Sequence, residues 1–181
     1  MVIQKAGGKS YEDFVRERIL KPLKMDATRM DSRSDVITGR ASGYYGSRSR
    51  GTLYNAEYYS PQQYFGSGCL LSSSKDLVKW DLALRNGKVF ADTKANPYAA
   101  RLFDFGWGKT GTKDHRSVWS GGGLYGHTCF MVRFIDDDIT VIVLTNFGDG
   151  APDRMARHIA GLYLPALAET ASTDEGRATG L

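Results

Sequence analysis

From residue 103 to residue 146 the chain alternates between apolar and polar residues in short runs, and this pattern predicts an antiparallel sheet. Each run is rich in β-branched or aromatic residues and is bounded by turn residues, as strands usually are. The connections at 111–114 and 136–138 are too short for crossovers, so neighbouring strands should run antiparallel. The expected strands are 105–109, 116–120, 127–134 and 139–146.

Helical spacing appears in three other segments. Ser10 is positioned to cap a helix that runs to about residue 20. A second helix should begin near Ser73, where Ser73 and Asp76 have the spacing of a capping box, and end at Asn86-Gly87. A last helix after Pro152 has an apolar stripe typical of a helix that covers a sheet. The members of this stripe are Met155, Ile159, Leu162, Tyr163 and Leu167.

The segment 26–65 is irregular and rich in Gly, Ser, Arg and Tyr, and the alternation at 51–54 predicts a hairpin within it. The whole order therefore predicts an α+β fold, with an antiparallel sheet of about four strands and helices packed on it. We expect one domain over residues 1–168, followed by a small, polar and disordered tail at 169–181.

Composition supports an ordinary globular domain. The chain has 181 residues, of which 41% are hydrophobic and 12% aromatic. No apolar run reaches the roughly 18 residues that a membrane-spanning helix needs, and the N-terminus has no apolar signal-peptide core. We expect no membrane span, and the compartment stays undetermined.

The net charge of +4 and the pI near 9.0 raise the question of nucleic-acid binding. The arginines of the irregular segment alternate with Ser, Gly and Asp and do not repeat on one helical face, which favours a solvated loop and no nucleic-acid partner. These arginines are Arg29, Arg33, Arg40, Arg48 and Arg50.

The cysteines and histidines predict no cofactor. Cys69 and Cys129 define no disulfide framework, and free, mostly buried thiols are expected. His115, His127 and His158 have no paired spacing, so neither a zinc site nor another metal or organic cofactor is implied.

The segments 118–134 and 136–146 form a Gly-rich strand, a turn and two long apolar strands, which resemble the C-terminal sheet of the serine β-lactamase and penicillin-binding protein superfamily. The resemblance continues upstream in 11–25 and 66–80. It implies a partial β-lactamase/transpeptidase-like fold. In that family the nucleophilic Ser-x-x-Lys motif lies N-terminal to the region that this chain resembles.

Two short motifs imitate the catalytic motifs of that family. Ser72 and Lys75 satisfy Ser-x-x-Lys, and Lys109-Thr110-Gly111 satisfies Lys-Thr-Gly. Ser72 lies at a helix start, where hydroxyls cap free N–H groups, and Lys75 should be exposed in the first turn. The second triplet falls at a hairpin turn, where Lys and Gly are expected for structural reasons. Ser72 and Lys75 are therefore weak catalytic candidates.

The resemblance places the substrate-lining strand of the family at Ser120-Gly121-Gly122. Glycine there would let an acyl substrate lie alongside as an added strand. The cation that the family has at the first of these positions is replaced by Ser120. The alternative interpretation is a glycine bulge that only bends the strand.

His127 is a third weak catalytic candidate. It lies an odd number of residues from Ser120, so we expect the two side chains on opposite faces unless the glycines form a bulge. A hydrogen-bonded or surface histidine is the preferred interpretation.

The resemblance implies the C-terminal part of a serine hydrolase that transfers the acyl group of a lactam, D-peptide or ester. Without its nucleophile this chain should not be catalytic by itself. The alternative is a non-catalytic relic, or an interaction module that pairs with another polypeptide. We also expect uncovered apolar surface along the first helix and one sheet face, which would favour self-association or a partner chain. If the chain is active, its other partner is a small-molecule acyl substrate.

Overall fold

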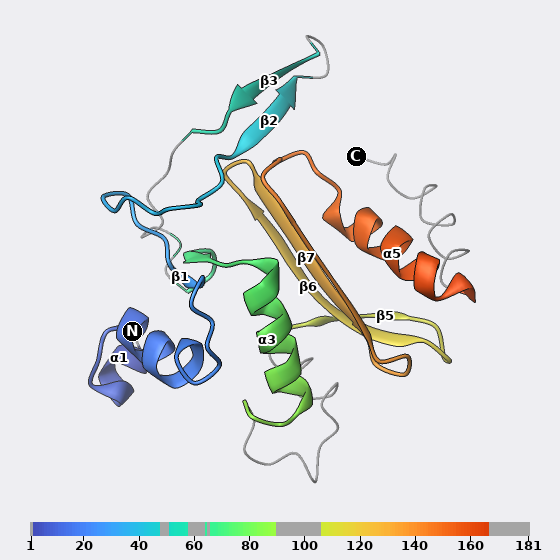
Figure 1. Ribbon diagram of the computed structural model, residues 1–181, viewed down its shortest axis with the longest axis horizontal. Helices are drawn as coiled ribbons and strands as arrows, with labels where there is room; N and C mark the ends of the chain where they lie inside the picture. Colours follow the sequence, from blue (N-terminus) through green and yellow to red (C-terminus); the bar gives the residue numbers. More distant parts are fainter. Residues whose placement is uncertain (1, 48–50, 58–63, 65, 90–105, 167–181) are drawn as a thin grey trace. The chain divides into compact units, whose positions relative to one another are not determined.

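The computed structural model describes residues 2–47, 51–57, 64, 66–89 and 106–166 (Figure 1). Contacts divide the chain into two compact units. The first comprises 1–40 and 58–98, and the second comprises 41–57 and 99–181. The expected tail at 169–181 lies outside the described residues.

The first unit is mainly helical. It contains α1 (Val2–Gly7), α2 (Tyr11–Val15), the π-helical turn η1 (Arg16–Leu20) that continues α2, and α3 (Ser74–Arg85). A two-residue strand, β1 (Arg29–Met30), pairs antiparallel with β4 (Leu70–Leu71). The predicted cap is confirmed, because the Ser10 hydroxyl accepts a 3.0 Å hydrogen bond from the Asp13 N–H.

The apolar side of α2 and η1 is covered within this unit. Val15, Leu20 and Met25 are buried together, and Trp80 of α3 packs against them. The expectation of an uncovered apolar surface along the first helix is therefore wrong. Met25, from the turn after η1, and Trp80, from α3, cover this side of the helix.

The second unit contains the predicted sheet. Its strands are β5 (Gly108–Gly111), β6 (Arg116–Leu124), β7 (His127–Phe134) and β8 (Ile139–Thr145), all antiparallel and in that order. Four antiparallel strands are thus confirmed. Residues 103–105 lie outside the described part.

The second strand is longer than predicted. β6 pairs with β7 without interruption from Ser117↔Phe134 to Leu124↔His127, through all the glycines. A two-residue turn at Tyr125 and Gly126, both with positive φ, closes this hairpin. The glycine bulge proposed as the alternative interpretation is therefore wrong.

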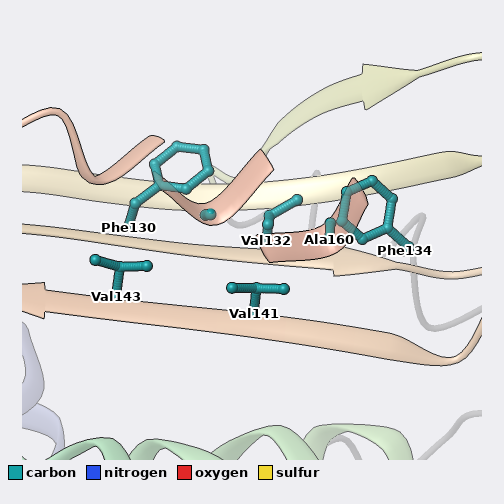
Figure 2. Packing of buried hydrophobic residues seen from close by; sticks show 7 residues of the cluster. Phe130, Val132, Phe134, Val141, Val143 and Ala160 are labelled. Atoms are coloured by element: carbon teal, nitrogen blue, oxygen red, sulfur yellow. The ribbon is translucent and has the colours of Figure 1, made fainter. Parts of the chain in front are cut away.

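The helix α5 (Pro152–Tyr163) covers one face of this sheet (Figure 2). Its buried side consists of Pro152, Ala156 and Ala160. Alanines let the helix approach closely, because the sheet supplies the bulky side chains. These are Phe130, Val132, Phe134, Val141 and Val143.

The predicted stripe on this helix is wrong. Met155 and Ile159 are 50% and 37% exposed, and Leu162 and Tyr163 are 82% and 73% exposed. The apolar period is present, but it lies on one flank of α5, beside the buried face and not on it. Leu167 lies outside the described residues.

A hairpin of β2 (Tyr44–Ser47) and β3 (Thr52–Asn55) confirms the prediction for the irregular segment. The Tyr44 N–H donates to the Asn146 carbonyl at 2.9 Å, and the Gly148 N–H donates to the Tyr44 carbonyl at 2.7 Å. These bonds attach the hairpin to the end of β8. Among the described residues, no helix is long and apolar enough to cross a membrane.

Candidate functional site

The Ser-x-x-Lys match lies at the start of α3, where the side chains of Ser72 and Ser73 form hydrogen bonds within the chain. The Ser73 hydroxyl caps the helix by accepting a hydrogen bond from the Asp76 N–H at 3.2 Å. The Ser72 hydroxyl lies 2.8 Å from the Thr28 hydroxyl, and Lys75 is exposed in the first turn. A lysine that activates a serine must be desolvated beside it, which is not the case here.

Asp76 is the buried charge of this segment, with 2% of its surface exposed. Its carboxylate accepts from the Ala27 N–H at 2.8 Å, the Thr28 hydroxyl at 2.9 Å and the Lys79 ammonium at 2.7 Å. Burial raises the pKa of Asp76, but the hydrogen bonds from Lys79, Thr28 and Ala27 outweigh it and leave the pKa below its ordinary value.

The predicted capping box is thus only half formed. The Ser73 hydroxyl accepts a hydrogen bond from the Asp76 N–H. The Asp76 carboxylate, however, accepts hydrogen bonds from Ala27 and Thr28 instead of from the Ser73 N–H. Aspartate is one methylene shorter than the usual glutamate, and no local pattern indicates its distant partners at 27–28. For this reason, sequence reasoning did not identify Asp76 as the residue that links α3 to the 27–28 segment.

The Lys-Thr-Gly match lies on the edge strand β5, as its structural interpretation predicts. Gly111 ends β5 with φ +97°, and a Cβ there would lie 2.0 Å from the His115 carbonyl oxygen. The Thr112 N–H donates to the same carbonyl at 3.2 Å and closes the turn. Glycine is therefore required by the turn itself.

The glycine-rich half of β6 has an open edge. Pairing with β5 extends only from Arg116 to Trp119, whereas pairing with β7 continues to Leu124. Among the described strands, 120–124 therefore has a neighbour on one side only. Backbone N–H and C=O groups alternate in direction along a strand, so half of these groups point to the open edge.

The glycines on this edge have different surroundings. A Cβ on Gly121 would lie 2.8 Å from the Phe130 ring and 3.0 Å from the Cys129 carbonyl oxygen. A Cβ on Gly122 would meet nothing within 4 Å. Packing among the described residues thus accounts for glycine at 121 but not at 122.

A hollow of about 370 Å³ lies between the glycine strand and the first turns of α5. Its lining includes the rings of Trp119 and Phe130, which stack with centroids 5.3 Å apart, and Gly121. Asp153 and Arg157 line it from the helix. The hollow therefore combines an apolar part with two charged groups beside the open edge of β6.

Ser120 lies on the opposite face from this hollow. It is exposed and opposes Met131 in the ladder, whereas Trp119 and Gly121 oppose the α5-facing Val132 and Phe130. Its hydroxyl carries no charge, so this position provides no cation for a substrate carboxylate.

His127 faces the same side of the sheet as Ser120, which corrects the parity expectation. The two-residue turn opposes His127 to Leu124, and Leu124, Gly122 and Ser120 alternate onto one face. No bulge is needed. The two positions are nevertheless four ladder steps apart, or about 13 Å along the strand.

The His127 ring is held at the hairpin tip. Its Nδ1 lies 3.0 Å from the Tyr125 carbonyl oxygen and its Nε2 lies 3.2 Å from the Ala41 carbonyl oxygen. Gly43 permits this approach, because a Cβ there would lie 2.2 Å from the Tyr125 oxygen. The hydrogen-bonded arrangement agrees with the preferred interpretation of this histidine.

The two cysteines differ in their exposure to solvent. Cys69 is buried, but Cys129 is exposed, so the expectation of buried thiols fails for Cys129, whose strand position turns it away from α5. Desolvation raises the pKa of the Cys129 thiol despite an opposing hydrogen bond from the Gly122 backbone. Within the described part of the chain, no group of three His, Cys, Asp or Glu residues has a metal-binding arrangement.

Two of the loop arginines form ion pairs within their own segment. Arg40 contacts Asp31 at 2.8 Å, and Arg29 pairs with Asp35. Arg48 and Arg50 lie outside the described residues.

Comparison with solved structures first defines the class of protein. The octameric penicillin-binding protein homologue of Pyrococcus abyssi superposes with a TM-score of 0.72 at 21% identity, over 91% of this chain and 40% of that one. The D-amino acid amidase of Ochrobactrum anthropi gives 0.67 at 19% identity, over 98% and 57%. At these identities the likeness shows a shared fold, that of penicillin-binding proteins and related amidases.

Sequence comparison then gives the family. The Beta-lactamase family model matches residues 1–164, and the chain belongs to this family of serine hydrolases. Penicillin-binding protein 4* of Bacillus subtilis is 28% identical over 166 residues, and the D-aminopeptidase of Brucella canis is 26% identical over 179. The chain covers 37% and 33% of those proteins, about a third of their length.

Proposed function

We propose that this chain forms the substrate-binding sheet of a serine hydrolase of the β-lactamase and penicillin-binding protein type. The substrate is the acyl part of a lactam, D-peptide, amide or ester. It lies extended along the open edge of β6 at 120–124 and adds a strand to the sheet.

One observation carries this proposal. A Cβ on Gly122 would point into open space, at a strand edge that no described strand covers. A strand interior normally disfavours glycine, because glycine loses the most conformational freedom and packs no side chain. Close approach of a ligand backbone is the remaining physical reason for its presence.

We do not assign the nucleophile to Ser72, the serine of the Ser-x-x-Lys match. Its hydroxyl is hydrogen-bonded to Thr28, and Lys75 is exposed. A fluorophosphonate probe should therefore leave Ser72 unlabelled in the 181-residue chain, as read by mass spectrometry of its peptides. Stoichiometric labelling of Ser72 would contradict this assignment.

Titration of the ¹⁵N-labelled chain with an N-acylated D-dipeptide tests the binding role. We expect the amide signals of 120–124 to shift, while those of β8 stay unchanged. Shifts confined to β8, or no shifts at saturating peptide, would show that the glycine edge does not bind substrate.

A second candidate function is self-association. It is favoured by the exposed apolar side of α5, where Met155 and Leu162 are 50% and 82% exposed, and by the octameric state named for the Pyrococcus abyssi relative. Light scattering should show an oligomer that the Leu162→Lys variant dissociates. A monomeric wild-type chain would exclude it.

A further inference from the structure

Both ring nitrogens of His127 lie against groups that can only accept a hydrogen bond. Nδ1 is 3.0 Å from the Tyr125 carbonyl oxygen, and Nε2 is 3.2 Å from the Ala41 carbonyl oxygen. A neutral imidazole has one N–H and donates to only one of these oxygens, so a ring lone pair then faces the other. The doubly protonated imidazolium donates to both. The charged ring is therefore the form that satisfies this geometry completely.

The two bonds join the tip of the β6–β7 hairpin to the segment that leads into β2. One carbonyl belongs to the turn at the tip, and the other belongs to the segment 41–43. The Tyr44 N–H, which follows this segment, also donates to the Gly126 carbonyl of the turn at 3.3 Å. The packing is close, because a Cβ on Gly43 would lie 2.8 Å from the His127 ring. The charge of this ring thus decides how many hydrogen bonds hold the tip to the segment.

The tip is also the end of the open strand edge. His127 opposes Leu124 in the ladder, and the edge at 120–124 ends there. Three consecutive glycines at 121–123 give this part of the strand the greatest conformational freedom. A ligand that adds a strand must order the edge, which weakens its binding, whereas an edge that is already ordered avoids this loss.

We propose that His127 is a positioning residue whose imidazolium form anchors the hairpin tip to the segment 41–43 and so orders the glycine edge for the substrate. It acts through the backbone and touches no reacting atom. Loss of one ring proton leaves a lone pair against a carbonyl oxygen and loosens the tip. Substrate binding should therefore strengthen as the pH falls through the range in which histidine takes up a proton. This inference rests on the proposed function, because it requires the substrate to lie along β6.

The other ionisable side chains in or next to the segments packed at the tip are of types that ordinarily titrate outside this range. Desolvation moves the pKa of the Cys129 thiol, the next side chain of β7 on the same face, still further above it. The remaining groups are Tyr44, Tyr125, Arg40, which pairs with Asp31, and the exposed Glu57. A pH dependence of binding between about pH 5 and about pH 8 is therefore assigned to histidine.

NMR of the full 181-residue chain provides the test. The ring ¹⁵N signals of His127 report its protonation directly, and both nitrogens should carry protons at about pH 5.5. Binding of N-acetyl-D-alanyl-D-alanine is followed through the amide signals of 120–124. The Kd should be up to about tenfold lower at about pH 5.5 than at about pH 8, the size of one hydrogen bond to a charged group.

His127→Gln keeps one donor but cannot take up a proton. Its Kd should be equal at the two pH values and close to the wild-type value at about pH 8. The matched controls are His115→Gln and His158→Gln, the other two histidines of the chain. His115 binds Asp137 at the opposite end of the sheet, and His158 is exposed on α5. Both controls should keep the wild-type pH dependence, which a side chain that only filled space would not produce.

The failures of the two proposals are distinguishable. If the peptide binds at 120–124 with the same Kd at both pH values, the assignment of His127 is wrong and the binding role of β6 stands. The same conclusion holds if His127→Gln keeps the pH dependence, if either control loses it, or if one His127 nitrogen stays unprotonated at the lower pH. If the peptide shifts none of these signals at either pH, the binding role and the inference from it both fail.

Discussion

The start of α3 and the second half of β6 are both short segments of small residues, but their surroundings differ. At the start of α3, the Ser72, Ser73 and Asp76 side chains all have hydrogen-bond partners within the chain. On β6, a Cβ on Gly122 would meet open space, and the strand edge has no described neighbour. The side chains of the segment that matches a catalytic motif are hydrogen-bonded within the chain. The strand edge of the segment that departs from its motif has no described neighbour.

This difference shows why a motif match is weak evidence of chemistry. A serine at a helix start serves the helix first, because the first turn has free N–H groups. A glycine in an extended strand loses stability, so its presence needs a reason outside the strand. Substitutions at the two segments should therefore have opposite consequences for stability and binding.

The largest expected effect is at Asp76. Asp76→Ala should lower the free energy of unfolding by about 3 kcal/mol, because it leaves the Thr28 hydroxyl and the Ala27 N–H without their charged acceptor. Urea denaturation measures the loss. Lys75→Ala, one residue away and exposed, should change stability by less than about 0.5 kcal/mol. If Asp76→Ala and Lys75→Ala changed stability equally, the hydrogen bonds of the buried Asp76 would not explain this segment.

The next effect separates two adjacent glycines. Gly121→Val should cost about 1–3 kcal/mol, because its Cβ would press on the Phe130 ring and the Cys129 carbonyl. Gly122→Val should leave the free energy of unfolding within about 0.5 kcal/mol of wild type but abolish binding of the acyl-D-dipeptide.

Thermal unfolding and peptide titration of both variants provide this comparison. A Gly122→Val chain that still binds the peptide would show that the open edge is not the binding surface. A strongly destabilised Gly122→Val chain would instead reveal a packing role that the structure does not contain.

A smaller effect is expected at Ser72. Ser72→Ala removes the hydrogen bond to Thr28 and should cost about 1 kcal/mol, with no effect on peptide binding. Denaturation and titration measure the two properties. If Ser72→Ala lost peptide binding but kept its stability, Ser72 would have a functional role and not only a structural one.

The smallest effect concerns the opposite end of β6, where Arg116 binds Asp136. The Arg116 N–H donates to Asp136 at 2.8 Å and its guanidinium forms further bonds, which lower the pKa of Asp136 to about 2. A lowered pKa adds stability above the ordinary value near 3.8, and this contribution is lost as the pH falls through about 2. Asp136→Asn should therefore be less stable than wild type at pH 5.

Denaturation curves at pH 5 and below pH 2 test this sign. The difference between Asp136→Asn and wild type should shrink on acidification. A difference that stays constant with pH would mean that the Arg116 contact contributes through hydrogen bonding alone.

Local patterns account for the elements that the sequence predicted correctly. The strands 127–134 and 139–146, the cap at Ser10 and the helix start at Ser73 follow from periodicity and capping within a few residues. The glycine strand was located by family resemblance rather than by any periodic pattern. The same resemblance implied that a substrate could lie along this strand as an added strand. The neighbouring hollow was not predictable, since it depends on where α5 begins.

The amino-acid sequence by itself determined which segments become strands and helices, because those choices depend on spacing and on contacts between near neighbours. Tertiary structure decided which side of each element is used. α5 buries Ala156 and Ala160 instead of its large apolar residues, since the sheet already fills the space between them. His127 shares a face with Ser120 because a two-residue turn reverses the chain between them. Asp76 binds the 27–28 segment, far away in the sequence, and no periodic pattern records a partner at that separation.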